Sequence, residues 1–580
     1  MNTETRAGRL EKLRQILLLV VPLVYVAVLS FSFSDEWFPA DDRQELFFVR
    51  NAGSVYSLLG SDVFGLFRPI KNLLFFLFAR LEPAGVKWCR LVGVGIGVLS
   101  FFPVLALCRR ILGSEWKALI AAAVWLLSPT LVSSAAWLSC VNIQIMVSFA
   151  ALAIACHNDA WNANGLRQSR ILLAGVFFFL SLVSYECAIS LLPILFFFDL
   201  FLRPERIRNR RVWSVYAFYV FIAVSYLIFR HCFNSSTKVN GSFTDIERWQ
   251  LVVSSPFFTA QHFYSWFWPF GRFTVFGSYQ WGQVSGTVLV LCALFFISLL
   301  VLALVGRKRN PVISFCIVFA LFAFAPVSNC LGLKSGPYGD YYLTLVSLGL
   351  AIGCVEAGAC LLGYSGKLRP LLVLIVVCFG LTRLFAIPES VRWARLWSQG
   401  QAAFFESIRN YPEFFSNKQM AATILFDSGY HLEALEYGRQ VENAVGSDSF
   451  QMSGVYLIRA LYALEDEKNA DKALAAIADS LRVGVEISGR TRLNAHYYRG
   501  CVFEDLKNDA EAAESEYMLA LSEQWSIDSV PCVDRLARLK VLRGELEEAI
   551  MLWERAAKLD PDNAAVRWNL AVAKRQAQGE

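Results

Sequence analysis

The chain has 580 residues, of which 56% are hydrophobic and only 18% are charged, and its mean hydropathy is positive. This composition excludes an ordinary soluble enzyme and indicates a protein embedded in a lipid bilayer. The formal net charge of +6 is modest and gives no reason to expect a nucleic-acid partner. No CxxC pair or Cys/His cluster has the spacing of a metal site, so we predict none.

Apolar runs begin after a basic amino-terminal segment and continue to residue 385. The first, Ile16–Phe33, is interpreted as a retained anchor because no small-residue cleavage site follows it. About twelve runs are long enough, or nearly so, to cross a bilayer. The basic clusters at 203–211 and 307–309 are expected to be cytoplasmic. Seven runs precede the first of these clusters, but a path between two cytoplasmic segments needs an even number of crossings, so one early run does not cross fully. Leu66–Leu81 is the short run that we expect not to cross, and we therefore predict about eleven spans.

This topology leaves two long loops on the extracytoplasmic side, Ser34–Gly65 and His231–Gly286. The second is almost continuously aromatic between residues 257 and 270, which is typical of helices lying in the membrane interface. Such a surface could admit a polyprenyl chain from the side. An aromatic belt without that role explains the composition equally well.

The first loop contains the acidic pair Asp41–Asp42, in the sequence SDEWFPADDRQELFFVRN. Adjacent carboxylates perturb each other, and one of them could serve as a base toward an acceptor hydroxyl. The next apolar run opens with Arg68 in FRPIKNLLFF. Because an arginine at a membrane interface needs a partner, we expect it to hold the catalytic aspartate or a phosphate. Glu186 is a further charge within an apolar run, and hence a site candidate.

In this order of motifs the chain resembles the C-type membrane glycosyltransferases. The motifs are a first membrane helix, a loop with DD, an RP-I motif opening a helix, a WLLSP stretch and then SYECAISLLPILFFFDLF. The chain is most similar to the transmembrane and tetratricopeptide-repeat protein O-mannosyltransferases and their bacterial relatives. The resemblance covers the membrane half in order.

The resemblance implies roles for particular residues. The acidic motif of the family falls on Asp41 and Asp42, its arginine–proline motif on Arg68 and Pro69, and its lysine–glutamate motif on Tyr185–Glu186, where only the glutamate is kept.

Other motif residues of the family are missing. The family has a histidine and a glutamate where this chain reads SPTLVSSAAWLS, and an arginine before the tyrosine where it reads Gly339–Tyr342. Lys334, Arg272 or Arg43 could replace the missing cation in binding a phosphate.

The implied reaction is an inverting transfer of a sugar from a polyprenyl or dolichyl phosphate to a protein or glycan hydroxyl. Asp41 or Asp42 would remove the acceptor proton while cationic groups stabilise the departing phosphate. The lipid-linked sugar is the donor substrate and no cofactor is certain. A divalent cation beside two carboxylates is allowed by the sequence but not required.

After residue 388 the composition becomes that of a soluble helical protein. The segment LRGELEEAIMLWERAAKLDP carries small and aromatic residues at the spacing of a tetratricopeptide repeat, with an earlier copy around Tyr517 and weaker ones around Gly429 and Ala473. The copies are spaced by more than the usual ~34 residues. Such a solenoid presents a groove for an extended peptide or a protein, here the acceptor. Self-association is the alternative.

We therefore predict an all-α protein with a transmembrane glycosyltransferase domain at 1–388 and an extracytoplasmic repeat domain at 389–580. The expected location is a bacterial inner membrane with the repeats in the periplasm, the alternative being an endoplasmic reticulum membrane with lumenal repeats. A catalytically inactive scaffold that recruits a partner is the competing function. A polysaccharide ligase or polymerase would instead place its key groups in the His231–Gly286 loop, and the acidic first loop speaks against it.

Overall fold

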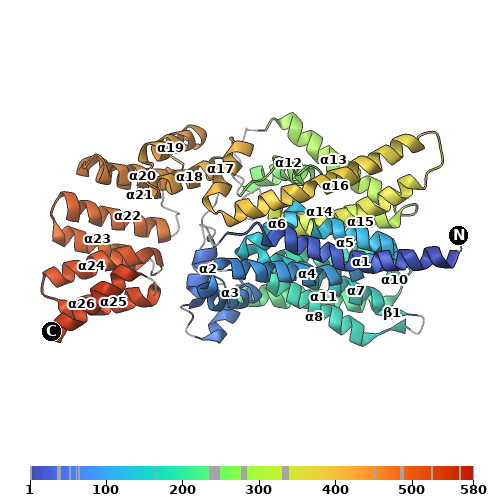
Figure 1. Cartoon of the computed structure of the whole chain (residues 1–580), viewed down its shortest axis with the longest axis horizontal. Helices are drawn as coiled ribbons and strands as arrows, with labels where there is room; N and C mark the ends of the chain where they lie inside the picture. The colour runs from blue at the N-terminus through green and yellow to red at the C-terminus, as the bar shows by residue number, and fades with distance from the viewer. Residues whose placement is uncertain are drawn as a thin grey trace.

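The computed structural model describes residues 3–34, 41–50, 54–60, 66–162, 165–233, 248–275, 284–328, 339–449, 452–483, 489–523, 527–560 and 563–578, together with residues 52, 62 and 525. Most of these residues are helical, and the strands named in this part of the chain form one two-residue antiparallel ladder. The helices form a long bundle and a curved solenoid beside one end of it (Figure 1). The prediction of an all-α fold is confirmed.

The bundle contains the first sixteen helices and the hairpin. Its elements are α1 Thr3–Ser30, α2 Asp41–Arg50, α3 Pro69–Leu81, α4 Val86–Leu112, α5 Glu115–Leu126, α6 Pro129–Ala136, α7 Val141–Asp159, β1 Trp161–Asn162, β2 Gly165–Leu166, α8 Gln168–Ser184, α9 Leu191–Leu202, α10 Pro204–Ile207, α11 Arg210–Phe233, α12 Arg248–Phe267, α13 Gly286–Gly306, α14 Pro311–Phe324, α15 Leu343–Leu362 and α16 Arg369–Ser398. Short 3-10 turns connect them, at η1 Val55–Leu59, η2 Glu82–Ala84, η3 Leu138–Cys140, η4 Glu186–Ser190, η5 Ala325–Val327 and η6 Asp340–Tyr342.

Seven helical segments in the described residues are long and apolar enough to cross a membrane. The pair α5 and α6 would add an eighth span, but it is bent by 54° where Pro129 opens α6. Two apolar helices, α8 and the α14 region, are shorter than a full span. At 13 residues α3 extends only about 20 Å, too little to cross. The sequence count of about eleven spans stays a prediction.

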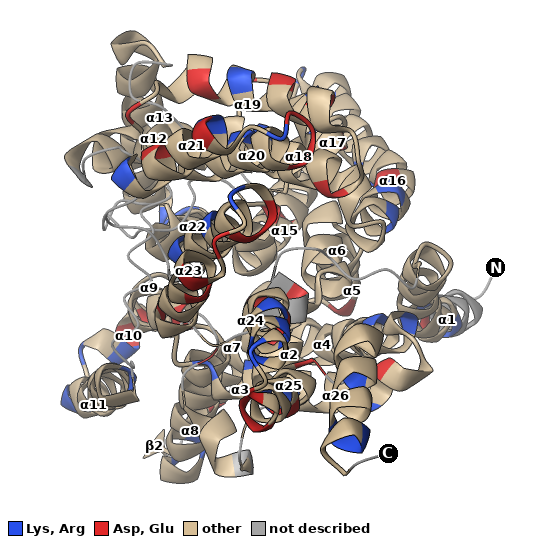
Figure 2. Ribbon diagram, turned by 90° about the vertical axis from the view of Figure 1, so that its left-hand side faces the viewer, with Lys and Arg blue, Asp and Glu red and all other residues tan. Residues whose placement is uncertain are grey.

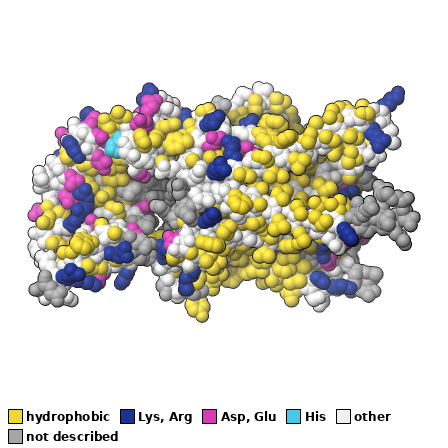
Figure 3. Space-filling view, viewed as in Figure 1, with side chains coloured by type: hydrophobic (Ala, Val, Ile, Leu, Met, Phe, Trp, Pro, Cys, Tyr) yellow, Lys and Arg dark blue, Asp and Glu magenta, His cyan; other side chains and the backbone are white. Residues whose placement is uncertain are grey.

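Apolar side chains cover most of the bundle surface, whereas the solenoid surface is mixed (Figure 3). Figure 1 shows the amino terminus, the hairpin and α10 at one end of the bundle, and α2 and α3 at the other end, beside the solenoid. The basic residues of segment 203–211 therefore lie at the end opposite α2 and α3.

Helix α16 joins the two parts without a break at Pro388, because it continues to Ser398. Its last turns pack into the bundle: the Trp397 ring stacks on Trp137 at 5.0 Å, and the Ser34 backbone N–H donates to Ser398 Oγ at 3.2 Å. The domain boundary placed at residue 388 stays a prediction.

Helical pairs continue from there to the end of the chain. They are α17 Gln401–Asn410, α18 Phe415–Asp427, α19 His431–Val445, α20 Met452–Glu465, α21 Ala470–Val483, α22 Gly489–Cys501 with the π turn η7 Val502–Leu506, α23 Ala510–Glu523, η8 Ile527–Ser529, α24 Val530–Leu542, α25 Leu546–Leu559 and α26 Ala564–Ala577.

Four of these pairs share the same turn. In each, a residue with positive φ lies two positions before the second helix: Gly429, Lys468, Asn508 and Gly544, with φ between 52° and 83°. These positions are about 36 to 40 residues apart, close to a repeat period. The left-handed turn suits glycine, and two of the four sites carry another residue.

Small residues let the paired helices approach each other. Ala549 and Ala556 are fully buried beside Trp553 in α25, and Ala513 and Ala520 are buried in α23. Charged residues of both signs lie on the outer faces, as Figure 2 shows, and many of them pair across helices. These include Lys540 with Glu514 at 2.9 Å.

Candidate functional site

Helix α2 holds the acidic motif against α3 and the turn η3, at the solenoid end of the bundle. Its apolar residues Leu46 and Val49 pack on α3, which leaves Asp42 on the covered side of the helix. Asp42 is fully buried, and its Oδ1 accepts hydrogen bonds from the backbone N–H of Ser139 at 2.9 Å and from Ser139 Oγ at 2.7 Å. The acidic motif is thereby fixed to Ser139, the last residue of the SPTLVSSAAWLS segment, in η3.

Arg68 is positioned by the start of α3. Pro69 takes the first helical position, where its missing N–H costs no hydrogen bond, and Arg68 forms the N-cap. The guanidinium binds Glu186 through two parallel hydrogen bonds, Nε to Oε2 at 2.7 Å and Nη2 to Oε1 at 2.5 Å. It also lies over the Tyr185 ring, 4.4 Å from the centroid. Both side chains are largely covered, with 11% of Arg68 and 22% of Glu186 exposed.

A second ion pair lies next to the first. Lys71, one turn after Arg68, pairs with Glu45 on α2, and its Nζ is 3.5 Å from Asp62. Arg68 Nη1 is 3.9 Å from the same Asp62 carboxylate. Glu45 and Asp62 are fully buried. Asp42, Glu45, Asp62, Arg68, Lys71 and Glu186 together form what we call the charge cluster.

The cluster sets the protonation of its members. Burial alone would raise the pKa of the Glu186 carboxyl, but Arg68 and, at longer range, Arg230 lower the pKa to about 2. Burial alone would lower the pKa of the Lys71 ammonium, but the carboxylates of Glu45 and Asp62 raise this pKa above its ordinary value. Glu186 is therefore a carboxylate at neutral pH, so it anchors Arg68 and does not donate a proton.

Aromatic residues continue from the cluster toward α16. The Tyr342 hydroxyl interacts electrostatically with Tyr185, and Tyr342 packs on Tyr341 at 4.3 Å. Tyr341 in turn meets the edge of Trp137 at 5.2 Å. The Gly339–Tyr342 segment therefore lies near the Arg68–Glu186 pair, although it lacks the arginine of the family motif.

The other predicted site residues fall into two groups. Arg272 lies elsewhere, over the Tyr264 ring at 4.7 Å and hydrogen-bonded to Tyr411 beside α17. Asp41 begins α2 and Arg43 follows, but their side chains lie outside the described residues, as does Lys334 entirely. Among the residues that the structure describes, no group of His, Cys, Asp or Glu side chains could hold a metal ion.

Sequence reasoning missed Glu45, Asp62, Lys71 and Arg230. Lys71 had a usable signal, since it is a charge inside the apolar run that Arg68 opens. Arg230 lies in the last turn of α11, far along the chain, and only the packed structure brings it near Glu186. The close partner of Arg68 in the structure is Glu186, and the expectation that Arg68 also holds the catalytic aspartate or a phosphate stays a prediction.

Comparisons with known proteins bear on the solenoid. A family model described as TPR repeat matches residues 537–576, from α24 to near the end of α26. The chain carries a tetratricopeptide repeat (TPR). No curated protein matches the chain.

Two solved structures are similar to the chain. A thermophilic TPR protein from Thermus thermophilus shares 22% identity with a TM-score of 0.25, covering 33% of this chain and 93% of its own. Yeast Tom70 shares 11% identity with a TM-score of 0.26, covering 82% and 96%. At such low TM-scores neither likeness adds to the argument.

Proposed function

We propose that this chain is an integral membrane glycosyltransferase that moves a sugar from a polyprenyl or dolichyl phosphate to a protein or glycan hydroxyl on the extracytoplasmic side. The observation that carries the proposal is the charge cluster: Arg68 and Lys71 of the α3 region meet Glu186 and Glu45 from two distant segments. Asp42 lies one turn before Glu45 on α2 and is held by Ser139. Buried charges cost free energy in an apolar bundle, and such residues usually mark a functional site.

The position of the cluster supports the same proposal. Asp42, Glu45, Arg68 and Lys71 lie on α2 or at the start of α3, at the solenoid end of the bundle and opposite the basic segment 203–211. By the positive-inside rule that basic end is cytoplasmic, so the cluster and the TPR solenoid share the outer side. A base, a cation and an acceptor-binding surface would then face one compartment. The bacterial inner membrane, with the solenoid in the periplasm, is the proposed setting.

In the proposed reaction the Asp41–Asp42 pair supplies the base. The acceptor hydroxyl attacks the anomeric carbon and gives its proton to the carboxylate. The bond from that carbon to the phosphate oxygen breaks, and the lipid phosphate leaves with the electron pair. Ser139 holds Asp42 in place, and Glu186 with Tyr185 holds Arg68. The result is inversion at the anomeric carbon.

The departing phosphate needs a positive charge, and Arg230 is the residue we assign to it. It lies near Glu186, yet among the described residues it forms no salt bridge of its own. Arg68, bound to Glu186, contributes a second positive charge. This arrangement would replace the arginine that the Gly339–Tyr342 segment lacks.

The TPR solenoid is proposed to bind the acceptor protein. TPR domains generally mediate protein interactions. A cavity of about 380 Å³ lies between α20, α22 and α24, with Tyr497, Tyr498 and Arg535 in its wall. The half-buried tyrosines lie beside Leu461 and Leu464, and together they suit an apolar side chain of a bound peptide.

The test compares extracytoplasmic glycoproteins by mass spectrometry in cells that carry the wild-type gene, no gene, or the Asp41→Asn, Asp42→Asn double variant. We expect glycopeptides that are present only with the wild-type gene, while membrane insertion of the variant is unchanged. Glu82→Gln is the matched control, because Glu82 pairs with Arg50 outside the cluster. Glycopeptides that persist in the double variant would remove the assignment.

A non-catalytic scaffold is the second candidate. The complete burial of Asp42 and its hydrogen bonds from Ser139 favour this candidate, because a carboxylate that only holds the η3 backbone in place would have the same contacts. The scaffold predicts that a partner protein copurifies with wild-type protein and double variant alike, with no change in glycosylation.

A further inference from the structure

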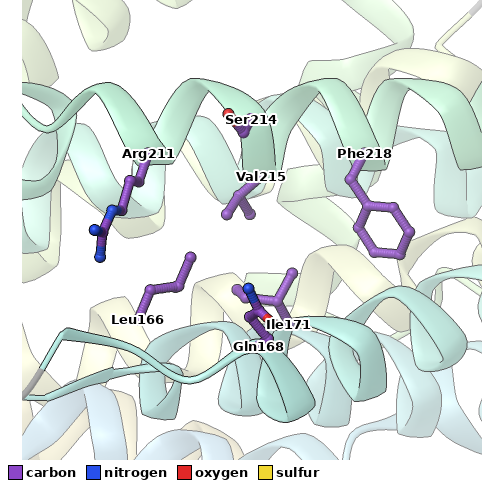
Figure 4. Close-up of a pocket in the computed structure, with 7 residues that line it drawn as sticks. All are labelled: Leu166, Gln168, Ile171, Arg211, Ser214, Val215 and Phe218. Atoms are coloured by element: carbon purple, nitrogen blue, oxygen red, sulfur yellow. The ribbon is translucent and has the colours of Figure 1, made fainter.

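A cavity of about 470 Å³ lies at the end of the bundle opposite the charge cluster. It is formed where α8 begins after the hairpin and α11 begins after α10 (Figure 4). Arg211 and Ser214 approach it from α11, and Gln168 points into it from α8. Its remaining walls are apolar, made by Leu166, Ile171, Val215 and Phe218. The cavity thus has one polar end and one apolar end.

The polar end carries uncompensated positive charge. The neighbouring cations have partners: Arg206 pairs with Asp199 at 3.1 Å and Arg110 with Asp159 at 2.6 Å. Arg211 has no salt bridge within the described part of the chain, and its side chain reaches over the hairpin toward Leu166. The surrounding segment 203–211 contains five arginines and one glutamate. An anion is therefore the complementary ligand.

The apolar end is closed by Phe218. It lies seven residues after Arg211, about 10 Å further along the helix. Gly175 on α8 lets this ring come close, because a Cβ atom there would be only 2.4 Å from Phe218 Cε1. Beyond this point the outer faces of both helices are apolar and exposed, with Val176 at 44% and Phe221 at 67%. Acyl chains would suit this surface.

We propose that this cavity binds the headgroup of an anionic phospholipid from the cytoplasmic leaflet. Arg211 contacts the phosphate, Gln168 and Ser214 hydrogen-bond to headgroup oxygens, and an acyl chain passes along Ile171 and Phe218. Basic pockets between membrane helices on the cytoplasmic side are suited to such headgroups. This inference rests on the membrane orientation in the proposed function, but not on its chemistry.

The experiment measures lipid retention by native mass spectrometry of the full-length protein, purified with phosphatidylglycerol or with phosphatidylcholine. We expect wild-type protein to retain phosphatidylglycerol preferentially, and Arg211→Ala to reduce that retention about tenfold. Arg210→Ala is the matched control. It removes the same charge from the neighbouring residue, whose side chain does not line the cavity. An equal loss of phosphatidylglycerol in the two variants would mean that general surface charge, and not this cavity, binds the lipid, and would overturn the proposal.

A second pair of variants tests the cavity itself. Ser214→Trp should fill it and abolish the retained lipid, whereas Ala217→Trp, on an exposed face of the same helix, should not. Displacement of the lipid by inorganic phosphate alone would indicate a free anion as the ligand and contradict the lipid assignment. The Asp41→Asn, Asp42→Asn variant should retain lipid normally, so loss of sugar transfer and loss of lipid binding are separable.

Discussion

Replacing Glu186 with Gln tests the ion pair that holds Arg68. The side chain keeps its shape and one hydrogen-bond acceptor but loses the charge that faces the guanidinium. Lowering the pKa of Glu186 from its ordinary 4.5 to about 2 corresponds to ~3 kcal/mol of the free energy of unfolding at neutral pH. With 22% of Glu186 exposed, solvent screening is limited and we expect a loss close to this value.

The pH dependence gives this prediction a sign. Because the folded pKa is depressed, the stabilisation is fully present above pH 4.5 and disappears as the pH falls toward 2. The stability difference between wild type and Glu186→Gln, measured by denaturant unfolding in micelles, should therefore shrink across that window. Glu82→Gln breaks a more exposed Arg–Glu pair and should cost less than about 1 kcal/mol. A Glu186→Gln loss no larger than this control, or one independent of pH, would refute the reasoning.

Three further predictions concern other parts of the molecule. Lys71→Met removes the cation that pairs with the buried Glu45 and leaves Asp62 with the more distant Arg68. It should cost about 3 to 5 kcal/mol of unfolding free energy, whereas Lys87→Met on the surface should cost little; equal losses would contradict the buried pair. Both Lys468 and Gly544 have positive φ, so Lys468→Gly should stabilise the solenoid by about 0.5–1 kcal/mol and Gly544→Ala should destabilise it by about 1 kcal/mol. Hydrogen exchange in the full chain measures both changes, and changes of the same sign would contradict the shared turn. Tyr498→Ala should raise KM for a protein acceptor and leave kcat unchanged, so a fall in kcat alone would argue against an acceptor groove.

The solenoid was largely predictable because its signals are local. Gly544, Ala549, Trp553 and Ala556 lie within one helical hairpin, and the spacing that predicts a TPR also places these residues in a turn and a buried face. The family match at residues 537–576 confirms this prediction.

The bundle was less predictable because hydropathy does not show where helices bend. The run Ala118–Leu131 reads as one span, yet Pro129 starts a new helix at 54° to the previous one. Similarly, the pairing of Arg68 with Glu186 joins residues 118 positions apart, and no linear spacing encodes it. Arg68 was correctly expected to need a partner at the start of a helix, but its identity depends on how α3 packs near η4.

The most direct test of the central claim is a transfer assay with purified full-length protein in nanodiscs. Polyprenyl-phosphate-linked radiolabelled mannose or glucose serves as donor, and extracytoplasmic protein from cells lacking the gene serves as acceptor. We predict transfer by the wild-type protein, a fall of at least about 100-fold in the Asp41→Asn, Asp42→Asn variant, and normal rates in Glu82→Gln. Equal rates in wild type and double variant, or no transfer from either donor by correctly folded wild type, would contradict the account and leave a membrane scaffold with a TPR solenoid.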